Sequence, residues 1–280
     1  MVLTKMIAVT KSLSHEEYLR KKRNRKLWRF IVVVLLVVLI VGVASYISHR
    51  QELRISKVEL NGGILVTQSD IESKTLTHLY GSYFWLFSKG NSFWYPKGDL
   101  EDYLRQTFKR IDSIDIHLKG LKTLVINIKE RKPFAIWCNT PTASTTVQKL
   151  ENGSEECYFI DQNSTIFAKA PYFSGDAYFK YYGLISLPVG SSPIGMEYVA
   201  STTEFGEISD FVSKVKDLSV HPLYMVAKNA NEFSIIIAGG GEIYLDLKEP
   251  LSVVGQNLEA LLRTPTFAST TGDLPVASFT

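Results

Sequence analysis

The chain has 280 residues, of which 45% are hydrophobic and 21% are charged, and its formal net charge is +3. Nine of the 31 Lys and Arg residues precede Phe30, against two of the 28 acidic residues, so the rest of the chain holds 22 bases and 26 acids. A nucleic-acid-binding surface needs clustered positive charge, so we exclude nucleic acid as a partner of this mildly acidic remainder.

An uninterrupted apolar stretch occupies residues 30–47 and carries no charge. As a helix it would rise about 27 Å, close to the thickness of the hydrocarbon core of a bilayer. Seven Lys or Arg lie in the ten residues before it, whereas the few basic residues after it are mixed with acids. This positive-inside bias predicts a single-pass protein of the inner (plasma) membrane, with a cytoplasmic tail at residues 1–29, a transmembrane helix at residues 30–48 and an extracytoplasmic remainder.

Two alternatives to an anchor exist for this stretch, a cleavable signal and a buried helix. A cleavable secretory signal has a shorter apolar core, about 7 to 15 residues, that ends in small residues. Here the core is longer, and Val43-Ala44-Ser45 followed by Tyr46 makes a poor cleavage site. A buried helix of a soluble protein is seldom apolar on every face. An uncleaved anchor is therefore favoured.

Residues 52–132 predict a small α+β domain with the element order β-α-α-β-β. An alternating run at residues 55–60 predicts the first strand. Thr67 predicts the start of a first helix, and Asp99 predicts the cap of a second. Two further alternating runs within residues 114–128 predict a closing hairpin.

An aromatic stretch at residues 83–95 connects the two predicted helices and contains Trp85 and Trp94. Core packing is the usual role of such a run, but a small domain has limited room for so many rings, so some are expected on the surface. Trp85 and Trp94 are therefore candidate partner-binding residues. A carbohydrate-binding platform is the alternative for the same rings.

Residues 133–280 predict a β-rich domain with two helices. A polar segment at residues 139–156, rich in Thr and Ser, predicts a surface loop. Apolar stripes predict helices at residues 205–218 and 251–262. The glycine triplet at residues 239–241 lies between two strand patterns, which favours a hairpin tip over a phosphate-binding loop. Strands are predicted at residues 157–160, 165–168, 181–187, 223–228, 232–237 and 242–247.

The two cysteines, Cys138 and Cys157, flank the polar loop. If the strands that carry them pair as a hairpin, a disulfide would close a loop of about 20 residues and stabilise the fold by about 3 kcal/mol. An extracytoplasmic compartment favours this bond, and two reduced thiols are the alternative.

No catalytic, metal-binding or cofactor-binding set is predicted, so we do not expect an enzyme. The five histidines lie far apart, without the spacing of zinc ligands. Ser213 and Lys216 match the Ser-x-x-Lys of penicillin-recognising enzymes, but the companion Ser-Asp-Asn and Lys-Thr-Gly motifs are absent, and both residues are expected on the wet face of a helix. Cys138 lies in a strand pattern, where a small buried thiol is more common than a nucleophile.

The order of several loose motifs points to a family. The strand end Ile55-x-x-Val58-x-Leu60-x-Gly62 and the run Glu130-Arg131-Lys132-Pro133 bracket the β-α-α-β-β pattern. Tyr158-Phe159-Ile160-Asp161 follows in the β-rich part and leads to Thr165-Ile166-Phe167. Together with the N-in transmembrane helix, this order resembles the FtsQ/DivIB family of bacterial cell division proteins, with its POTRA domain before Pro133 and its β domain after it. The resemblance covers nearly the whole chain, although each motif alone is weak.

The resemblance implies a bitopic divisome scaffold that recruits and regulates septal peptidoglycan synthesis through protein contacts, without chemistry of its own. It implies FtsB/DivIC-like and FtsL-like coiled-coil proteins as partners, besides the lipid bilayer. In that family a further strand follows the helix that resembles residues 251–262, and it forms part of the docking surface. This sequence stops at Thr280, about where that strand would begin, so no contact residue is carried over from that segment.

Exposed sheet edges recruit partners by strand addition, and the run at residues 242–247 is the candidate edge here. We expect Ile243 and Leu245 to pack inward, and Tyr244 and Asp246 to face a partner. An ordinary inner strand is the alternative. Two rival functions are a membrane-anchored envelope hydrolase or transpeptidase, which would need a catalytic set, and a POTRA-type secretion component, which would need the many alternating segments of an outer-membrane barrel.

Overall fold

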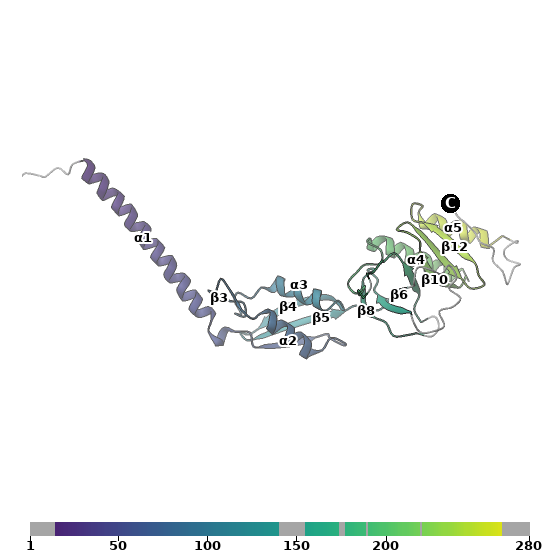
Figure 1. Cartoon of the computed structure of the whole chain (residues 1–280), viewed down its shortest axis with the longest axis horizontal. Helices are drawn as coiled ribbons and strands as arrows, with labels where there is room; N and C mark the ends of the chain where they lie inside the picture. The colour runs from purple at the N-terminus through teal and green to yellow at the C-terminus, as the bar shows by residue number, and fades with distance from the viewer. Residues whose placement is uncertain (1–14, 140–154, 174–176, 189, 219, 265–280) are drawn as a thin grey trace, which may run out of the picture. The chain divides into compact units, whose positions relative to one another are not determined.

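A computed structural model describes residues 15–139, 155–173, 177–188, 190–218 and 220–264 of the chain. In these residues the fold is mixed α+β, with one long N-terminal helix followed by a β-rich body (Figure 1). The predicted domain border between residues 132 and 133 stays a prediction. By its internal contacts the chain divides into two compact units, the first made of residues 1–59, 69–100 and 116–125, and the second of residues 60–68, 101–115 and 126–280.

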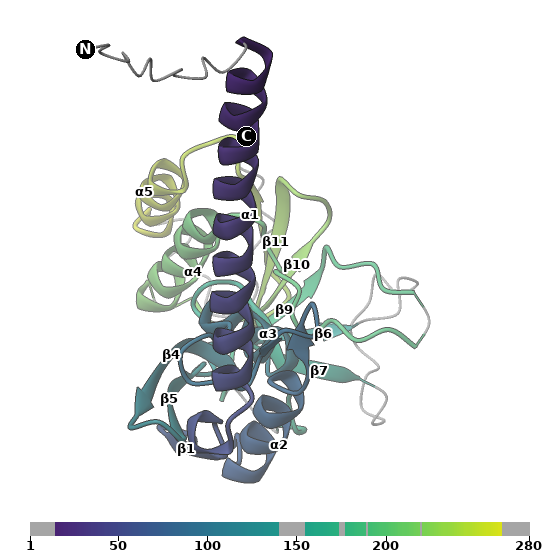
Figure 2. The same cartoon turned by 90° about the vertical axis from the view of Figure 1, so that its left-hand side faces the viewer.

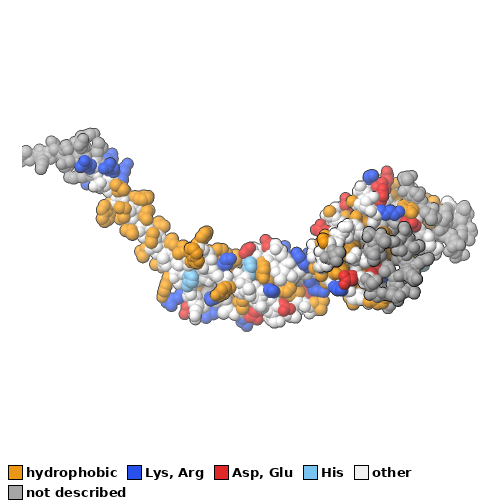
Figure 3. Space-filling view, viewed as in Figure 1, with side chains coloured by type: hydrophobic (Ala, Val, Ile, Leu, Met, Phe, Trp, Pro, Cys, Tyr) orange, Lys and Arg blue, Asp and Glu red, His pale blue; other side chains and the backbone are white. Residues whose placement is uncertain are grey.

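The N-terminal helix, α1 (His15–Ser48), contains the predicted transmembrane segment. Its part Lys22–Ser48 is long and apolar enough to cross a membrane. The apolar side chains are exposed, for example at Leu39, and Figure 3 shows them along the helix, with Lys and Arg side chains toward its N-terminal end. A helix with apolar side chains exposed on all sides suits a lipid environment rather than water. The helix is therefore consistent with a single-pass membrane protein.

A three-stranded sheet follows, with the strand order β1-β5-β4. The strands are β1 (Lys57–Asn61), β4 (Ile111–Lys119) and β5 (Thr123–Glu130). Two helices, α2 (Gln68–His78) and α3 (Lys97–Thr107), lie between β1 and β4 in the sequence. The alternating runs predict β4 and β5 correctly, because apolar side chains recur at every second position of a half-buried strand. Buried side chains on these elements or directly beside them are Val58, Ile71, Leu79, Leu100, Leu104, Ile114, Ile116, Leu124, Ile126 and Ile128.

The start of α3 differs from the prediction. The helix begins at Lys97, directly after Pro96, and the Pro96 carbonyl accepts a hydrogen bond from the Leu100 N–H at 2.9 Å. Asp99 therefore lies inside the first turn, and its predicted role as the cap is wrong. Its carboxylate lies 3.0 Å from His78 Nε2 instead. The helix starts three residues earlier than a cap at Asp99 predicts, directly after Pro96, whose fixed φ is compatible with the start of a helix.

Seven strands form the larger sheet, in the order β12-β11-β10-β9-β6-β7-β8. β9 pairs in parallel with β6 and with β10, and the other neighbours pair antiparallel. Most of the predicted loop at residues 139–156 lies outside the described residues. The strands are β6 (Ala135–Asn139), β7 (Glu156–Ile160), β8 (Ile166–Lys169), β9 (Lys180–Gly183), β10 (Pro222–Ala227), β11 (Glu232–Ile237) and β12 (Glu242–Asp246).

β9 is shorter than the predicted strand at residues 181–187. It ends at Gly183, where φ is 83°, and a Cβ atom at this position would meet the carbonyl oxygen of Ala227 on β10. Leu184 follows with φ 62°. Two successive residues in the left-handed region turn the chain out of the sheet, which the alternating pattern does not reveal.

Helices α4 (Thr202–Asp217) and α5 (Leu251–Leu262) cover one face of the larger sheet at its β10–β12 end (Figure 2). Ser201 caps α4, because its hydroxyl accepts the Glu204 N–H at 3.2 Å. The predicted apolar stripe of α4 is buried in the shared core except at Leu218, which follows the end of the helix and is partly buried, and α5 has the predicted bounds. Prominent members of this core are Trp137, Ile160, Tyr181, Phe205, Ile208, Phe211, Val215, Met225, Phe233, Ile235, Ile243, Leu245, Val254 and Leu258.

Candidate interaction surfaces

β12 is the last strand of the larger sheet among the described residues. The Leu247 N–H donates to the Asn231 carbonyl at 2.8 Å, which fixes the phase of the ladder between β11 and β12. Because the hydrogen bonds of an antiparallel pair alternate, the odd-numbered residues of β12 bond to β11. The backbone groups of Glu242 and Tyr244 therefore point toward the open side of the strand.

The opposite edge of the sheet, at β8, is bonded to a neighbouring segment at its first residue. On β8 the Ile166 N–H donates to the Met196 carbonyl at 2.9 Å, and the Ile166 carbonyl accepts the Gly195 N–H at 2.7 Å. The segment at residues 195–197 thus occupies the start of this edge. Proteins usually protect edge strands from pairing with other chains. An edge strand such as β12, whose outward backbone groups can pair with an added strand, is therefore a candidate binding site.

The side chains of β12 alternate as predicted. Ile243 and Leu245 are buried against the helices, at 4% and 3% exposure, while Tyr244 and Asp246 lie half-buried on the other face. The inward packing of Ile243 and Leu245 is confirmed. A contact of Tyr244 or Asp246 with a partner stays a prediction.

Tyr244 and its neighbours form a small polar cluster beside the open edge. The Tyr244 hydroxyl donates to Glu242 Oε2 at 2.8 Å, and Lys228 Nζ lies 4.0 Å from the centre of the Tyr244 ring. The hydrogen bond to Glu242, followed by burial, raises the pKa of Tyr244. The hydroxyl therefore stays protonated near neutral pH and can serve a partner as donor or acceptor.

Asp246 has a local structural role. Its Oδ1 accepts the Lys248 N–H at 3.0 Å, and its carbonyl accepts the Glu249 N–H at 3.0 Å. These bonds close the turn that leads from β12 to α5. Of the two predicted contact residues on this strand, Asp246 thus already uses its carbonyl and one carboxylate oxygen in this turn.

Tyr244 also ends a row of aligned residues that crosses six strands, on the sheet face opposite α4 and α5. The hydroxyl of Ser234, the next residue in that row, is buried and has no hydrogen-bond partner among the residues that the structure describes. Further along, burial and then the bond to Glu155 raise the pKa of the Tyr182 hydroxyl far above its ordinary value. The row consists of Cys157, Cys138, Tyr182, Val226, Ser234 and Tyr244.

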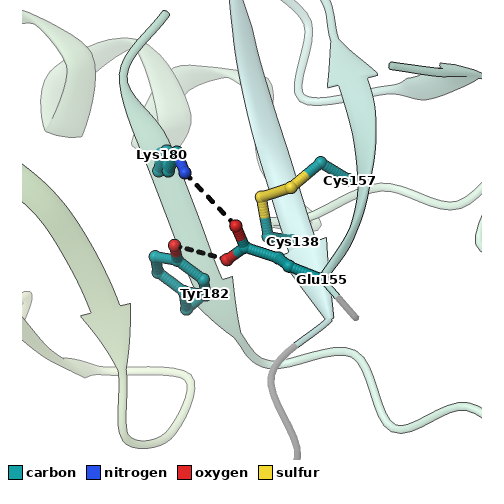
Figure 4. The surroundings of a disulfide bond; sticks show 5 residues. All are labelled: Cys138, Glu155, Cys157, Lys180 and Tyr182. Atoms are coloured by element: carbon teal, nitrogen blue, oxygen red, sulfur yellow. Dashed lines mark hydrogen bonds and ion pairs between the residues drawn. A yellow bond between two sulfur atoms is a disulfide. The ribbon is translucent and has the colours of Figure 1, made fainter. Parts of the chain in front are cut away.

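Figure 4 shows the far end of this row, where the structure joins Cys138 and Cys157 in a disulfide across β6 and β7. Their Cα atoms are 4.1 Å apart. Glu155 lies beside the bond and accepts from the Tyr182 hydroxyl at 2.7 Å and from Lys180 Nζ at 3.2 Å. The contacts of Glu155 therefore tie the start of β7 to β9, across the strand β6 that lies between them.

The aromatic stretch forms a hairpin that the sequence pattern does not predict. Strands β2 (Ser82–Tyr83) and β3 (Phe87–Ser88) pair antiparallel, and the three-residue loop between them carries Trp85. Trp85 is 91% exposed and the preceding Phe84 is 87% exposed. Trp94 is 44% exposed and packs with Phe87, at 5.9 Å between ring centres. Partner binding by either tryptophan stays a prediction.

The run Glu130-Arg131-Lys132-Pro133 binds backbone and side chains far along the sequence. Glu130 Oε1 accepts three successive N–H groups, from Ile64, Leu65 and Val66, at 2.8 to 2.9 Å. Burial acts to raise the pKa of Glu130, but these three donors, together with the nearby positive charge of Arg110, lower it on balance. Successive N–H groups around one oxygen form an anion-binding nest, here filled by the chain itself. The sequence pattern around Glu130 does not reveal this contact.

Arg131 connects the run at residues 130–133 to the run at residues 158–161, two of the motifs that carry the family resemblance. Its Nη1 forms an ion pair with Asp161, and its Nε donates to the Lys109 carbonyl at 3.2 Å. Asp161 Oδ1 in turn accepts the N–H groups of Asn163 and Thr165 at 2.9 Å. The Arg131 and Asp161 side chains are 18% and 7% exposed, so the pair is largely shielded from water.

Among the described residues, no catalytic set forms around Ser213, Lys216 or Cys138, the candidate positions in the sequence. Ser213 and Lys216 are both exposed on α4, as expected. Cys138, Cys157 and Glu155 place possible metal-ligand atoms close together, but both sulfurs are used in the disulfide, and metal binding requires thiolates. A cavity of about 40 Å³ beside the disulfide has room for only a water or so.

Comparison with protein-family models gives no match for this chain, and comparison with curated proteins gives none either. The case for a function therefore comes from the sequence motifs and from the surfaces described above.

Proposed function

We propose that this chain is a bitopic divisome scaffold of the FtsQ/DivIB type, with a cytoplasmic N-terminus and its remaining domains outside the inner membrane. In this proposal it recruits and regulates septal peptidoglycan synthesis through protein contacts. The observation that carries the proposal is the edge position of β12, the last strand of the larger sheet among the described residues, with the backbone of Tyr244 directed outward, whereas at the other edge Ile166 is bonded to a neighbouring segment.

The element order supports a POTRA domain at residues 52–132. β1, α2, α3, β4 and β5 follow the β-α-α-β-β order, and β5 lies between β1 and β4 in the sheet. The extra hairpin of β2 and β3 is inserted between the two helices. Support also comes from Glu130 and Arg131, since both residues of the family motif make long-range contacts that a chance match would not require.

The open edge fits partners that bind through an added strand. Main-chain hydrogen bonds to β12 supply affinity in this mode, and flanking side chains select the partner. Tyr244, Glu242 and Lys228 are the flanking side chains here. We propose FtsB/DivIC-like and FtsL-like membrane proteins as the partners, because the family resemblance implies them.

The proposal predicts that Tyr244→Pro abolishes partner binding while the fold survives. The Tyr244 N–H is not used by β11, so proline removes the outward donor and blocks an added strand without breaking the existing ladder. The matched control is Tyr244→Thr, which keeps the N–H and the strand preference. The measurement is co-purification of the host's FtsB/DivIC-like and FtsL-like proteins with the tagged full-length chain.

Wild type and Tyr244→Thr are expected to retain the partners, and Tyr244→Pro is expected to lose them with an unchanged circular dichroism spectrum. Unchanged co-purification with Tyr244→Pro would refute binding by strand addition at β12. Imaging a fluorescent fusion of the full chain tests the wider proposal, because a divisome scaffold must accumulate at the division site. A uniform membrane signal in dividing cells would count against it.

A further inference from the structure

The tip of the β2–β3 hairpin displays two large aromatic side chains in an unfavourable backbone conformation. Phe84 and Trp85 have φ values of 48° and 60°, and they are 87% and 91% exposed. Left-handed backbone disfavours bulky residues, and such exposure gives them little packing in return. Glycine or asparagine would suit the turn better. Contacts within the folded chain therefore do not explain why large aromatic residues occupy this turn, which points to a contact outside the chain.

The hairpin is fixed to the C-terminal end of α1. Ser45 Oγ donates to the Leu86 carbonyl at 2.6 Å, and Ser48 Oγ accepts the Ser88 N–H at 2.7 Å. Asn91 Nδ2 donates to the Ser48 carbonyl at 3.1 Å. Both elements belong to the first compact unit, so their relative placement is part of that unit's structure.

These bonds set the level of the hairpin along α1. Ser45 lies two residues before the end of the apolar stretch at residues 30–47. At a rise of about 1.5 Å per residue, the Leu86 carbonyl is held within about 3 Å of that end. When the apolar stretch fills the hydrocarbon core, the hairpin tip lies at the boundary between acyl chains and headgroups.

The surroundings of the tip have the composition of a membrane interface. Tyr46 and Phe93 are each 64% exposed, and Figure 3 shows further hydrophobic side chains next to the C-terminal end of α1. Two cations lie over aromatic rings of this region: Arg50 is 4.9 Å from the Tyr46 ring centre, and Lys89 Nζ is 5.3 Å from that of Tyr83. Aromatic rings with basic neighbours are typical of the headgroup level.

We propose that Phe84, Trp85 and Leu86 insert into the interface of the same bilayer that α1 crosses. Lipid is the occupant because the exposed rings continue the apolar surface of α1, and the hairpin that carries them is hydrogen-bonded to α1 at that level through the Leu86 carbonyl and the Ser88 N–H. The hairpin is then a second membrane contact of the first unit, besides α1. It limits rotation of that unit about the long axis of α1 within the membrane. This inference rests on the membrane span of α1 but not on any partner of β12.

The test uses the full-length chain in vesicles of phosphatidylethanolamine and phosphatidylglycerol that carry brominated acyl chains. The variant W28F/W94F leaves Trp85 and the buried Trp137, and the matched variant W28F/W94F/W85F leaves Trp137 alone. The difference in emission between the two reports Trp85. We expect quenching by bromines near the headgroup, weaker quenching by bromines near the bilayer centre, and loss of this quenching in the matched variant.

Carbonate extraction of the same vesicles separates the possible failures. If the chain stays in the membrane and Trp85 is quenched by aqueous acrylamide but not by brominated lipid, the hairpin inference is overturned while the anchor stands. If the chain is extracted, α1 does not span, which overturns the inference together with the membrane part of the proposed function. Protection of Trp85 from acrylamide in native membranes but not in vesicles would assign the tip to a protein and overturn lipid insertion.

Discussion

At the scale of single residues, Glu130 does the most to connect distant parts of the sequence. One carboxylate oxygen satisfies three successive N–H groups of the segment between β1 and α2. Burial opposes the ionised form, yet the donors lower the pKa of Glu130 below its ordinary value of 4.5. A carboxyl group whose pKa is depressed by folding stabilises the fold above its unfolded pKa, and this stabilisation is lost as the pH falls through the folded pKa.

We therefore predict that Glu130→Gln lowers the free energy of unfolding by about 1 kcal/mol at pH 7, because a neutral amide oxygen is a weaker acceptor than a carboxylate and the site is partly open to solvent. The difference from wild type should disappear at a pH below the depressed pKa of Glu130. Denaturant unfolding of the full chain in detergent, repeated from pH 7 to pH 3, measures both. Glu207→Gln, on the exposed face of α4, is the control and should show no such trend. A constant difference at all pH values would contradict the proposed role of the charge.

At the scale of elements, Arg131 and Asp161 join the end of β5 to the loop between β7 and β8. The pair is largely buried, and Asp161 also organises that loop through its second oxygen. Removing one partner of a buried pair leaves a charge without compensation, which costs far more than an exposed pair contributes.

Arg131→Met is thus expected to lower the free energy of unfolding by about 3 kcal/mol. Lys129→Met is the matched control: Lys129 also pairs with an acid near this site, Asp112 at 3.3 Å, but its side chain is 70% exposed. That change should cost less than about 1 kcal/mol. Thermal or denaturant unfolding of both full-length variants gives the comparison. Equal effects of the two substitutions would mean that the Arg131 pair is no stronger than a surface pair.

At the scale of the whole molecule, the distribution of charge about α1 predicts the orientation in the membrane. Nine Lys and Arg residues precede the apolar stretch, and the remainder of the chain is mildly acidic. In spheroplasts, external protease is expected to digest an epitope at the C-terminus and to leave one at the N-terminus intact, because basic segments stay on the cytoplasmic side. Detergent permeabilisation should remove the protection. Digestion of the N-terminal epitope in intact spheroplasts would show the opposite orientation.

The candidate surfaces were only partly predictable. The alternation in residues 242–247 gives the inward packing of Ile243 and Leu245, since side chains of a strand alternate between its faces. The same pattern says nothing about which strands are neighbours, so the edge position of β12 could not be deduced from it. The richness in aromatic residues points to Trp85, but the attachment of its hairpin to Ser45 and Ser48 depends on contacts across 41 and 40 positions of sequence.

The sequence by itself determined the features that depend on local pattern: the apolar length of α1, the alternation of β4, β5 and β12, the glycine hairpin before β12, and the amphipathic α4 and α5. Only the tertiary structure decided the insertion of β9 in parallel between β6 and β10, the open edge at β12, the nest around Glu130 and the hairpin beside α1. These features arise from pairings between distant segments, whose stability depends on the packing of the whole sheet and core, and a local pattern of apolar residues is compatible with many such pairings.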